Sequence, residues 1–331
     1  MIDRRRLIAL AGASTTAALL PGGAKAQAKG WPNRAVRLMV PFAPGGGTDG
    51  IARVIAARLS EVWGQQMVIE NRGGAGSNLG AEAIARAEPD GYSVLVGSLP
   101  LAVNKHIYAS LGYDAFTDFA PVTLLCIYPN LMIVPNSSPV KSVAEFVAHA
   151  KANPGKITYG SSGTGTSTHL AGELFKRKAG IEMTHVPYRG VSSALNDLMP
   201  GRLDVMFNTV GGTLQQARAG QVRGLAVTSA KRFPTALEYP TIVEAGVPGL
   251  ADFNVSSWYA LFMPAKTPRD IVQKLNADTV AILAEPEIKQ RLERLGLAIV
   301  GSTPAELGRH LKAESELWAP VIQAAGIKSE G

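Results

Sequence analysis

Short apolar segments typical of β-strands alternate with amphipathic helical segments along most of the chain. Residues 36–40 form one such apolar segment, and the glycine-rich stretch "PFAPGGGTDG" follows it. Ile51, Val54, Ile55 and Leu59 then recur at the spacing of one helix face. Strands and helices in alternation predict parallel strands covered by helices. The pattern therefore favours an α/β fold.

The number of alternating segments is too large for one small sheet. Further strands are predicted at 68–70, 92–96, 131–134, 157–160, 183–186, 205–207, 225–227 and 258–264. We therefore expect two α/β lobes, each a mainly parallel sheet flanked by helices. Residues 27–126 would form the first part of lobe 1, residues 127–230 lobe 2, and residues 231–331 would return to lobe 1 with the C-terminal helices. The chain would cross between lobes near 126–129 and again near 228–240.

The N-terminus has the three parts of a secretory signal peptide. Three arginines at positions 4–6 precede an Ala/Leu-rich stretch at 7–20, and the small-residue pattern Ala-Lys-Ala ends at Ala26. The apolar stretch is shorter than the roughly 20 residues that span a bilayer. We predict that residues 1–26 are removed, with Ala28 as the second choice of cleavage site, and that the protein is periplasmic. The order Arg-Arg-Arg-Leu-Ile also suggests the twin-arginine route.

Charge and cysteine content narrow the function further. The chain carries a net charge of +7, and removal of residues 1–26 leaves +4. These charges are scattered, which argues against nucleic-acid binding, while a mild positive field attracts small anions. Cys126 is the only cysteine, so no intrachain disulfide forms, and its apolar surroundings predict a buried thiol. The five histidines show no metal-binding spacing, and we expect neither metal nor cofactor.

Two strand-to-helix connections share one pattern, in which a strand is followed by a glycine- and hydroxyl-rich loop and then by a helix. The first is "PFAPGGGTDGIARVIA" from residue 41, and the second is "YGSSGTGTSTHLAGELF" from residue 159. Parallel sheets bind ligands at the carboxyl ends of their strands, where helix N-termini offer unpaired N–H groups. Glycines let the backbone approach a ligand, and hydroxyls can donate to an anionic oxygen. Two such loops across a cleft would hold a molecule with a carboxylate at one or both ends.

Taken singly, each loop also has a purely structural explanation. The glycines at 45–47 can form a tight turn with Asp49 as a helix cap, and Thr166 or Ser167 can cap the second helix. The matching positions of the two loops, together with the export signal, favour binding.

Several single side chains could contribute to such a cleft. Phe42 is a candidate for its aromatic wall or for the core, and Ser98 follows a predicted strand end. His169 could donate to a ligand or pack against the loop. Arg189 could pair with a carboxylate or stay solvated. Asn208 could hydrogen-bond the ligand or serve a turn.

Enzyme motifs are not complete in either loop. The first loop lacks the Lys-Ser/Thr pair of a P-loop, and the second misses the G-x-S-x-G pattern because position 164 is Thr164. No paired acid and base can be named. An exported α/β enzyme acting on an organic acid, or a purely structural exported protein, remains an alternative.

Four stretches resemble one known family. They are "WPNRAVRLMVPFAPGGGTDGIARVIA", "VIENRGGAGSNLGAEAIARAEPDGYSVLVGS", "ITYGSSGTGTSTHLAGELFK" and "HVPYRGVSSALNDLMPGRLDVMF". In this order they are similar to the substrate-binding proteins of tripartite tricarboxylate transporters, the Bug family. The resemblance covers essentially the whole mature chain. It implies a periplasmic-binding-protein (Venus flytrap) fold, whose two lobes close on a small organic carboxylate without catalysis.

The resemblance also implies partners and site residues. The ligand's carboxylate would be held by backbone amides, hydroxyls and ordered water, and the protein would hand it to membrane permease subunits. A signalling role as an orphan ligand sensor is the alternative. We expect a monomer. The resemblance points to a set of ligand-binding residues in the two loops and at two further strand ends: Phe42, Gly46, Gly47, Thr48, Asp49, Ser98, Ser161, Ser162, Gly163, Thr164, His169 and Asn208.

Overall fold

The computed structural model describes residues 30–329, and the predicted signal peptide lies outside this range. The strands are β1 Val36–Val40, β2 Met67–Asn71, β3 Ser93–Ser98, β4 Phe119–Val134, β5 Thr158–Ser161, β6 Thr184–Pro187, β7 Val205–Thr209, β8 Arg223–Val227, β9 Ser256–Pro264 and β10 Ala298–Ile299. The α-helices are α1 Gly47–Trp63, α2 Asn78–Ala85, α3 Leu99–Val103, α4 Val143–Ala152, α5 Ser167–Ala179, α6 Val191–Leu198, α7 Val210–Arg218, α8 Arg269–Leu283, α9 Pro286–Arg294 and α10 Pro304–Ala324. Short 3₁₀ turns lie at Ala75–Ser77, Asn104–His106 and Val243–Ala245. None of the helices in this range is both long and apolar enough to cross a bilayer.

The strands form one continuous path in the order β2-β1-β3-β9-β4-β7-β5-β6, and β8 and β10 also pair with β4. β1 runs parallel to β2 and β3, and β5 runs parallel to β6 and β7. β9 and β4 are antiparallel to the strands beside them. The outer strands are therefore parallel, as expected, and the two long central strands make the sheet mixed.

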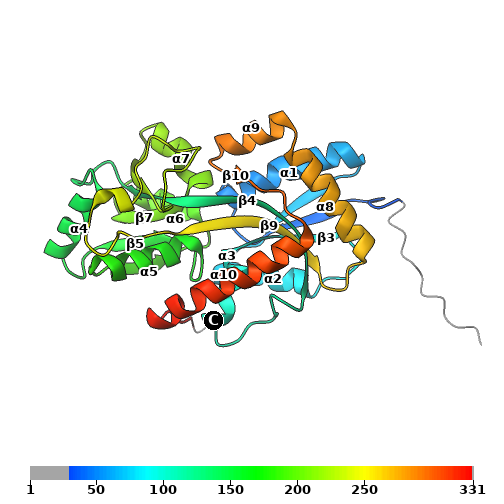
Figure 1. Cartoon of the computed structure of the whole chain (residues 1–331), viewed down its shortest axis with the longest axis horizontal. Helices are drawn as coiled ribbons and strands as arrows, with labels where there is room; N and C mark the ends of the chain where they lie inside the picture. The colour runs from blue at the N-terminus through cyan, green and yellow to red at the C-terminus, as the bar shows by residue number, and fades with distance from the viewer. Residues whose placement is uncertain (1–29, 330–331) are drawn as a thin grey trace, which may run out of the picture.

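β4 and β9 join the two halves of the molecule. β4 pairs with β9 from Phe119 to Pro129 and with β7 from Asn130 to Ile133, so a single strand belongs to both halves. Figure 1 shows β4 and β9 running between a group of helices that contains α4 to α7 and a group that contains α1, α2, α8 and α9. We refer to the half with β1–β3 as lobe 1 and to the half with β5–β8 as lobe 2. The chain has the α/β periplasmic-binding-protein fold that the sequence predicts.

Residues 231–255, predicted to belong to lobe 1, contact lobe 2. Lys178 Nζ lies 2.7 Å from the Asp252 carboxylate, and the N–H of Val255 donates to the carbonyl of Thr228 at 2.8 Å. These contacts favour a second crossing near Val255, where the chain enters β9. The exact lobe boundaries stay a prediction.

Side-chain caps begin helices α4 and α10. At α10, the hydroxyl of Thr303 accepts from Glu306 N–H at 3.3 Å, and the Glu306 carboxylate accepts from Thr303 N–H at 2.8 Å, so the two residues form a capping box. At α4, Ser142 accepts from Glu145 N–H at 3.2 Å. The Glu145 carboxylate accepts instead from the N–H of Lys141, one residue before the cap.

The core lies on both faces of the sheet. Met39 belongs to one cluster of buried apolar side chains, while its neighbours Leu38 and Val40 belong to the other. This division follows from the two-residue period of a strand. Cys126 is fully buried, and burial raises the pKa of its thiol, as a thiol acting as a small hydrophobe requires.

Candidate ligand-binding site

The first glycine loop leads directly into α1. Gly46 is the N-cap residue, and no side chain caps the helix, so its first N–H groups are not taken by a capping side chain. Gly47 has no room for a side chain, because an added Cβ would lie 2.8 Å from the Tyr259 hydroxyl and 3.2 Å from the Thr209 hydroxyl. Glycine at this position therefore lets the start of α1 pack directly against two hydroxyl groups.

The carboxylate of Asp49 stabilises this loop through hydrogen bonds. Its carboxylate accepts from Gly45 N–H at 3.0 Å, from Arg53 Nε at 2.8 Å and from Asn71 Nδ2 at 3.1 Å. Burial opposes ionisation, but the hydrogen bonds from Arg53, Gly45 and Asn71 outweigh it and lower the pKa of Asp49. The charge is thus satisfied within the protein, and Asp49 holds the turn rather than facing the pocket.

The second loop closes on itself through hydroxyl groups. Thr166 caps α5, since its Oγ1 accepts from His169 N–H, and it also donates to the Gly163 carbonyl at 2.6 Å. The Thr168 hydroxyl accepts from Ser162 N–H at 2.9 Å. These bonds fix the loop in the shape that presents Ser162 and Thr166 to the pocket.

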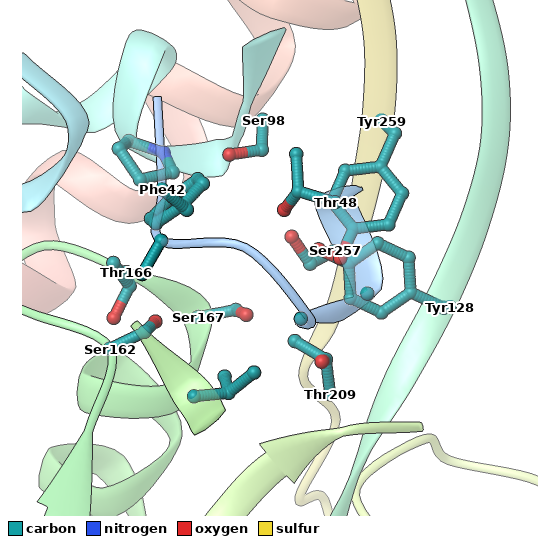
Figure 2. Close-up of a pocket in the computed structure, with 15 residues that line it drawn as sticks. Phe42, Thr48, Ser98, Tyr128, Ser162, Thr166, Ser167, Thr209, Ser257 and Tyr259 are labelled. Atoms are coloured by element: carbon teal, nitrogen blue, oxygen red, sulfur yellow. The ribbon is translucent and has the colours of Figure 1, made fainter. Parts of the chain in front are cut away.

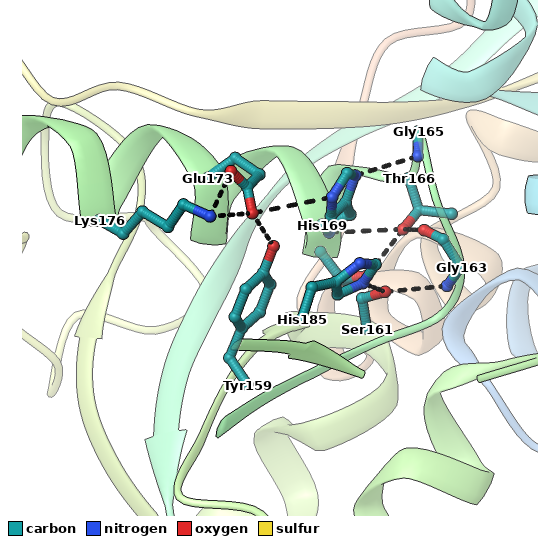
Figure 3. Close-up of polar contacts among 10 residues, drawn as sticks. Tyr159, Ser161, Gly163, Gly165, Thr166, His169, Glu173, Lys176 and His185 are labelled. Atoms are coloured by element: carbon teal, nitrogen blue, oxygen red, sulfur yellow. Dashed lines mark hydrogen bonds and ion pairs between the residues drawn. The ribbon is translucent and has the colours of Figure 1, made fainter. Parts of the chain in front are cut away.

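Two stacked histidines lie beside the second loop (Figure 3). The ring of His169 packs on that of His185 at a centroid distance of 4.1 Å, and His169 Nδ1 accepts from Gly165 N–H at 3.2 Å. His185 Nε2 lies 2.6 Å from the Ser161 hydroxyl. Burial lowers the pKa of His169 well below its ordinary value and that of His185 to about 4. Both imidazoles are therefore neutral at pH 7, and they support the loop through their contacts with Gly165 and Ser161.

The two loops and the central strands surround one pocket, shown in Figure 2. It is narrow, because only about 20 Å³ is open to the centre of a water-sized group. We call it the hydroxyl pocket, because nine of its fifteen lining residues carry a hydroxyl group. Among the described residues that line it, none has a charged side chain: Phe42, Ala43, Gly46, Gly47, Thr48, Ser98, Pro100, Tyr128, Ser162, Thr166, Ser167, Val191, Thr209, Ser257 and Tyr259.

The strands that join the lobes form one wall of the pocket. Tyr128 on β4 and Tyr259 on β9 pack with their ring centroids 4.4 Å apart, and Ser257 lies beside them (Figure 2). Burial raises the pKa of Tyr259 to about 12, and hydrogen bonding with Thr48 and Tyr128 opposes this only in part. The Tyr259 phenol therefore stays protonated and can donate a hydrogen bond.

A third helix start reaches the pocket at Thr209, the N-cap residue of α7. Its side chain is almost fully buried and lies near Tyr259, but its hydroxyl makes no hydrogen bond of good geometry within residues 30–329. A buried hydroxyl without a partner is unfavourable, so this group is suited to bind a polar ligand atom.

Six of the predicted binding residues line the hydroxyl pocket, and six do not. The first group is Phe42, Gly46, Gly47, Thr48, Ser98 and Ser162. The second group is Asp49, Ser161, Gly163, Thr164, His169 and Asn208. Asn208 is fully buried, and its amide bonds the Thr213 hydroxyl and the N–H of Thr209. Ligand binding by any of these twelve residues stays a prediction.

Other residues that line the pocket were not predicted from the sequence. Thr209 ends β7 in the stretch "FNTVGGT", a further strand-to-helix connection rich in glycine that the same pattern could have identified. Tyr128, Ser257 and Tyr259 lie in strands that cross between the lobes. Nothing local in the sequence marks them as pocket residues.

The loops of the two lobes touch, so the structure is a closed form. Ala43 N–H donates to the Arg189 carbonyl at 3.4 Å. An added Cβ on Gly76 of lobe 1 would lie only 2.1 Å from the Thr164 carbonyl of lobe 2. The hydroxyl pocket is therefore enclosed by both lobes at once.

Fold and pocket together define a two-lobed solute-binding protein. In residues 30–329, no group of three or more histidine, cysteine, aspartate or glutamate side chains is arranged to hold a metal ion. Residues 51–327 match the family described as "Tripartite tricarboxylate transporter family receptor", and the chain belongs to this family. The family comprises binding proteins rather than enzymes.

Named relatives agree with this placement. A UPF0065 protein of Pseudomonas sp. (strain P51) is 40% identical over 97% of this chain and 94% of its own length. Protein BugT of Bordetella pertussis is 31% identical over 99% of both chains.

Two similar solved structures contain a carboxylate ligand. The structure of Rpa4515 from R. palustris with adipate has a TM-score of 0.86 and 41% identity, and covers 89% of this chain and 98% of that one. MatC from Rhodopseudomonas palustris with bound malate has a TM-score of 0.83 and 33% identity, and covers 88% and 100%.

Proposed function

We propose that this protein captures a small organic carboxylate in the hydroxyl pocket and delivers it to the membrane subunits of a tripartite transporter. The observation that carries the proposal is the convergence of several helix starts, among them those of α1, α5 and α7, on a pocket lined by hydroxyl groups. The adipate and malate bound by the two solved relatives support a carboxylate as the ligand class.

The pocket can stabilise a negative charge without a buried cation. Helix N-termini present unpaired N–H groups and the positive end of the helix dipole. Hydrogen bonds to a charged group contribute about 1.5–3 kcal/mol each, so three or four of them support micromolar binding after the costs of association. A site without a buried counter-ion also suits a carrier that must release its ligand.

Location and partners follow from the family and the N-terminus. We propose a periplasmic protein that acts as a monomer, and the arginines at 4–6 favour export by the twin-arginine route. Replacement of these arginines by lysine should leave the precursor in the cytoplasm if that route is used, which fractionation of cells would show. Light scattering of the mature protein should give the mass of one chain.

A calorimetric titration tests the binding proposal. The mature protein should bind at least one small mono- or dicarboxylate, and Thr48→Ala and Ser162→Ala should each weaken that binding by about tenfold or more. Ser110→Ala, an exposed hydroxyl outside the pocket lining, serves as the matched control. Unchanged affinity in both pocket variants would place the site elsewhere.

A further inference from the structure

A second cavity adjoins the hydroxyl pocket, and Ser162 lines both. Lobe 1 contributes residues 74–76 and Tyr108 to this outer cavity, and lobe 2 contributes residues 162–164 and 187–189. The outer cavity leaves about 310 Å³ open to the centre of a water-sized group. The hydroxyl pocket leaves only about 20 Å³ on the same measure.

The two volumes assign different parts of a ligand to the two spaces. One water needs roughly 10–15 Å³ on this measure, so the hydroxyl pocket of the closed form admits a group about as large as a carboxylate. The carbon chain of an organic acid needs more room. The outer cavity, which shares Ser162 with the hydroxyl pocket, supplies that room.

Arg189 provides the charge that the hydroxyl pocket lacks. Its side chain is exposed and makes no hydrogen bond or ion pair with another side chain in residues 30–329. Its backbone is held in place, because its carbonyl accepts from Ala43 N–H and packs against Gly73. The backbone of Arg189 is therefore held where the two lobes meet, and its side chain extends from that position at the edge of the outer cavity.

No acidic residue among the described lining residues competes for this arginine. Asp197, which is linked to the cavity residue Tyr188, accepts from the Tyr188 hydroxyl at 2.8 Å and from Arg202 at 2.9 Å. Hydrogen bonds from Tyr188 and Arg202 lower the pKa of Asp197, so its charge is already balanced. An anion entering the outer cavity would meet a guanidinium without a protein partner.

We propose that the outer cavity is a second subsite, in which Arg189 pairs with the distal carboxylate of an elongated dicarboxylate whose first carboxylate occupies the hydroxyl pocket. This inference rests on the proposed function. A guanidinium binds a carboxylate through two parallel hydrogen bonds, a geometry that an uncharged side chain cannot reproduce. Arg189 then selects dicarboxylates over monocarboxylates, while the hydroxyl pocket binds the group that both classes share.

The experiment compares the two ligand classes at equal carbon number. Dissociation constants of straight-chain α,ω-dicarboxylates with four to eight carbons, and of the matching monocarboxylates, are measured by calorimetry on the wild type, Arg189→Gln and Arg177→Gln. Arg177 is an exposed arginine on α5 that lines neither cavity, and it controls for the loss of one positive charge.

We expect Arg189→Gln to lose about tenfold or more in affinity for the preferred dicarboxylate and less than twofold for the monocarboxylates, with Arg177→Gln unchanged. Equal losses for both classes, or no loss for dicarboxylates, would overturn the second subsite. Thr48→Ala separates this outcome from a failure of the proposed function, because it should weaken both classes. A wild type that binds neither class would overturn both proposals.

Discussion

The hydroxyl of Ser192 in lobe 2 donates a hydrogen bond to the carbonyl of Pro44 in lobe 1 at 3.1 Å. Ser192 lies in the first turn of α6, and Pro44 lies in the glycine loop before α1. The bond therefore connects the first glycine loop, which lines the hydroxyl pocket, to the opposite lobe. It can form only while the lobes are closed.

Ser192→Ala should weaken the closed state. A single hydrogen bond contributes about 0.5–1.5 kcal/mol, so the ligand's dissociation constant should rise about two- to tenfold, mainly through faster release. Stopped-flow fluorescence with a bound carboxylate measures both rates. Ser193→Ala removes a neighbouring exposed hydroxyl and should change neither rate. A slower association rate with unchanged release would contradict the role of Ser192 in closure.

Gly76→Ala should prevent the lobes from meeting. An added Cβ would lie 2.1 Å from the Thr164 carbonyl, and φ at Gly76 is +58°, a region that disfavours alanine. Gly64 has a similar φ of +64° but open space around it, so Gly64→Ala carries only the conformational cost of about 1 kcal/mol. Calorimetry should show a large loss of ligand affinity for Gly76→Ala alone. Equal affinity in the two variants would show that this contact does not limit closure.

Thr209→Val should separate binding from stability. The Thr209 hydroxyl is buried near Tyr259 and makes no hydrogen bond of good geometry in the described part of the chain, so its replacement should change the free energy of unfolding little or raise it. Ligand affinity should fall about tenfold. Thr279 on α8 is also buried with an unpartnered hydroxyl, and Thr279→Val should affect stability in the same way while leaving affinity intact. Chemical denaturation and calorimetry test the two effects separately.

Acid should destabilise the protein through the histidine pair. Burial depresses the pKa of His185 from 6.5 to about 4, so the folded state binds fewer protons than the unfolded state between these values. The stabilisation is fully present above about pH 6.5 and is lost as pH falls towards 4, by about 3 kcal/mol for this residue. His169 acts in the same direction.

Urea denaturation of the mature protein at intervals from pH 7 to pH 4.5 measures this loss. His185→Asn should flatten the dependence of unfolding free energy on pH in that range, whatever its effect on stability at pH 7. A variant with the same slope as the wild type would show that His185 titrates normally in the folded protein.

Much of the fold follows from local pattern. The strands expected at 36–40 and 205–207 and the capping box at Thr303 are present because apolar alternation and helix capping act between near neighbours. β4 was predicted only at 131–134, although it begins at Phe119. Its prolines argue against a strand, but the register of β4 against β9 shifts just after Pro121, which accommodates that proline at a bulge. Helix α9 and strand β10 had no clear signal.

The same distinction between local pattern and distant contacts applies to the candidate site. The two glycine loops that begin helices, and the hydroxyl groups around them, could be predicted from the sequence, because these features depend on residues a few positions apart. Which side chains line the hydroxyl pocket depends on the tertiary structure. It turned Asp49 and His169 inward as supports, and it brought Thr209, Tyr128 and Tyr259 into the pocket from distant segments. Asp49 and His169 are held by partners on neighbouring strands, Asn71 and His185. Tyr128, Thr209 and Tyr259 reach the pocket through packing between residues that lie more than eighty positions apart, and local pattern carries no record of either kind of contact.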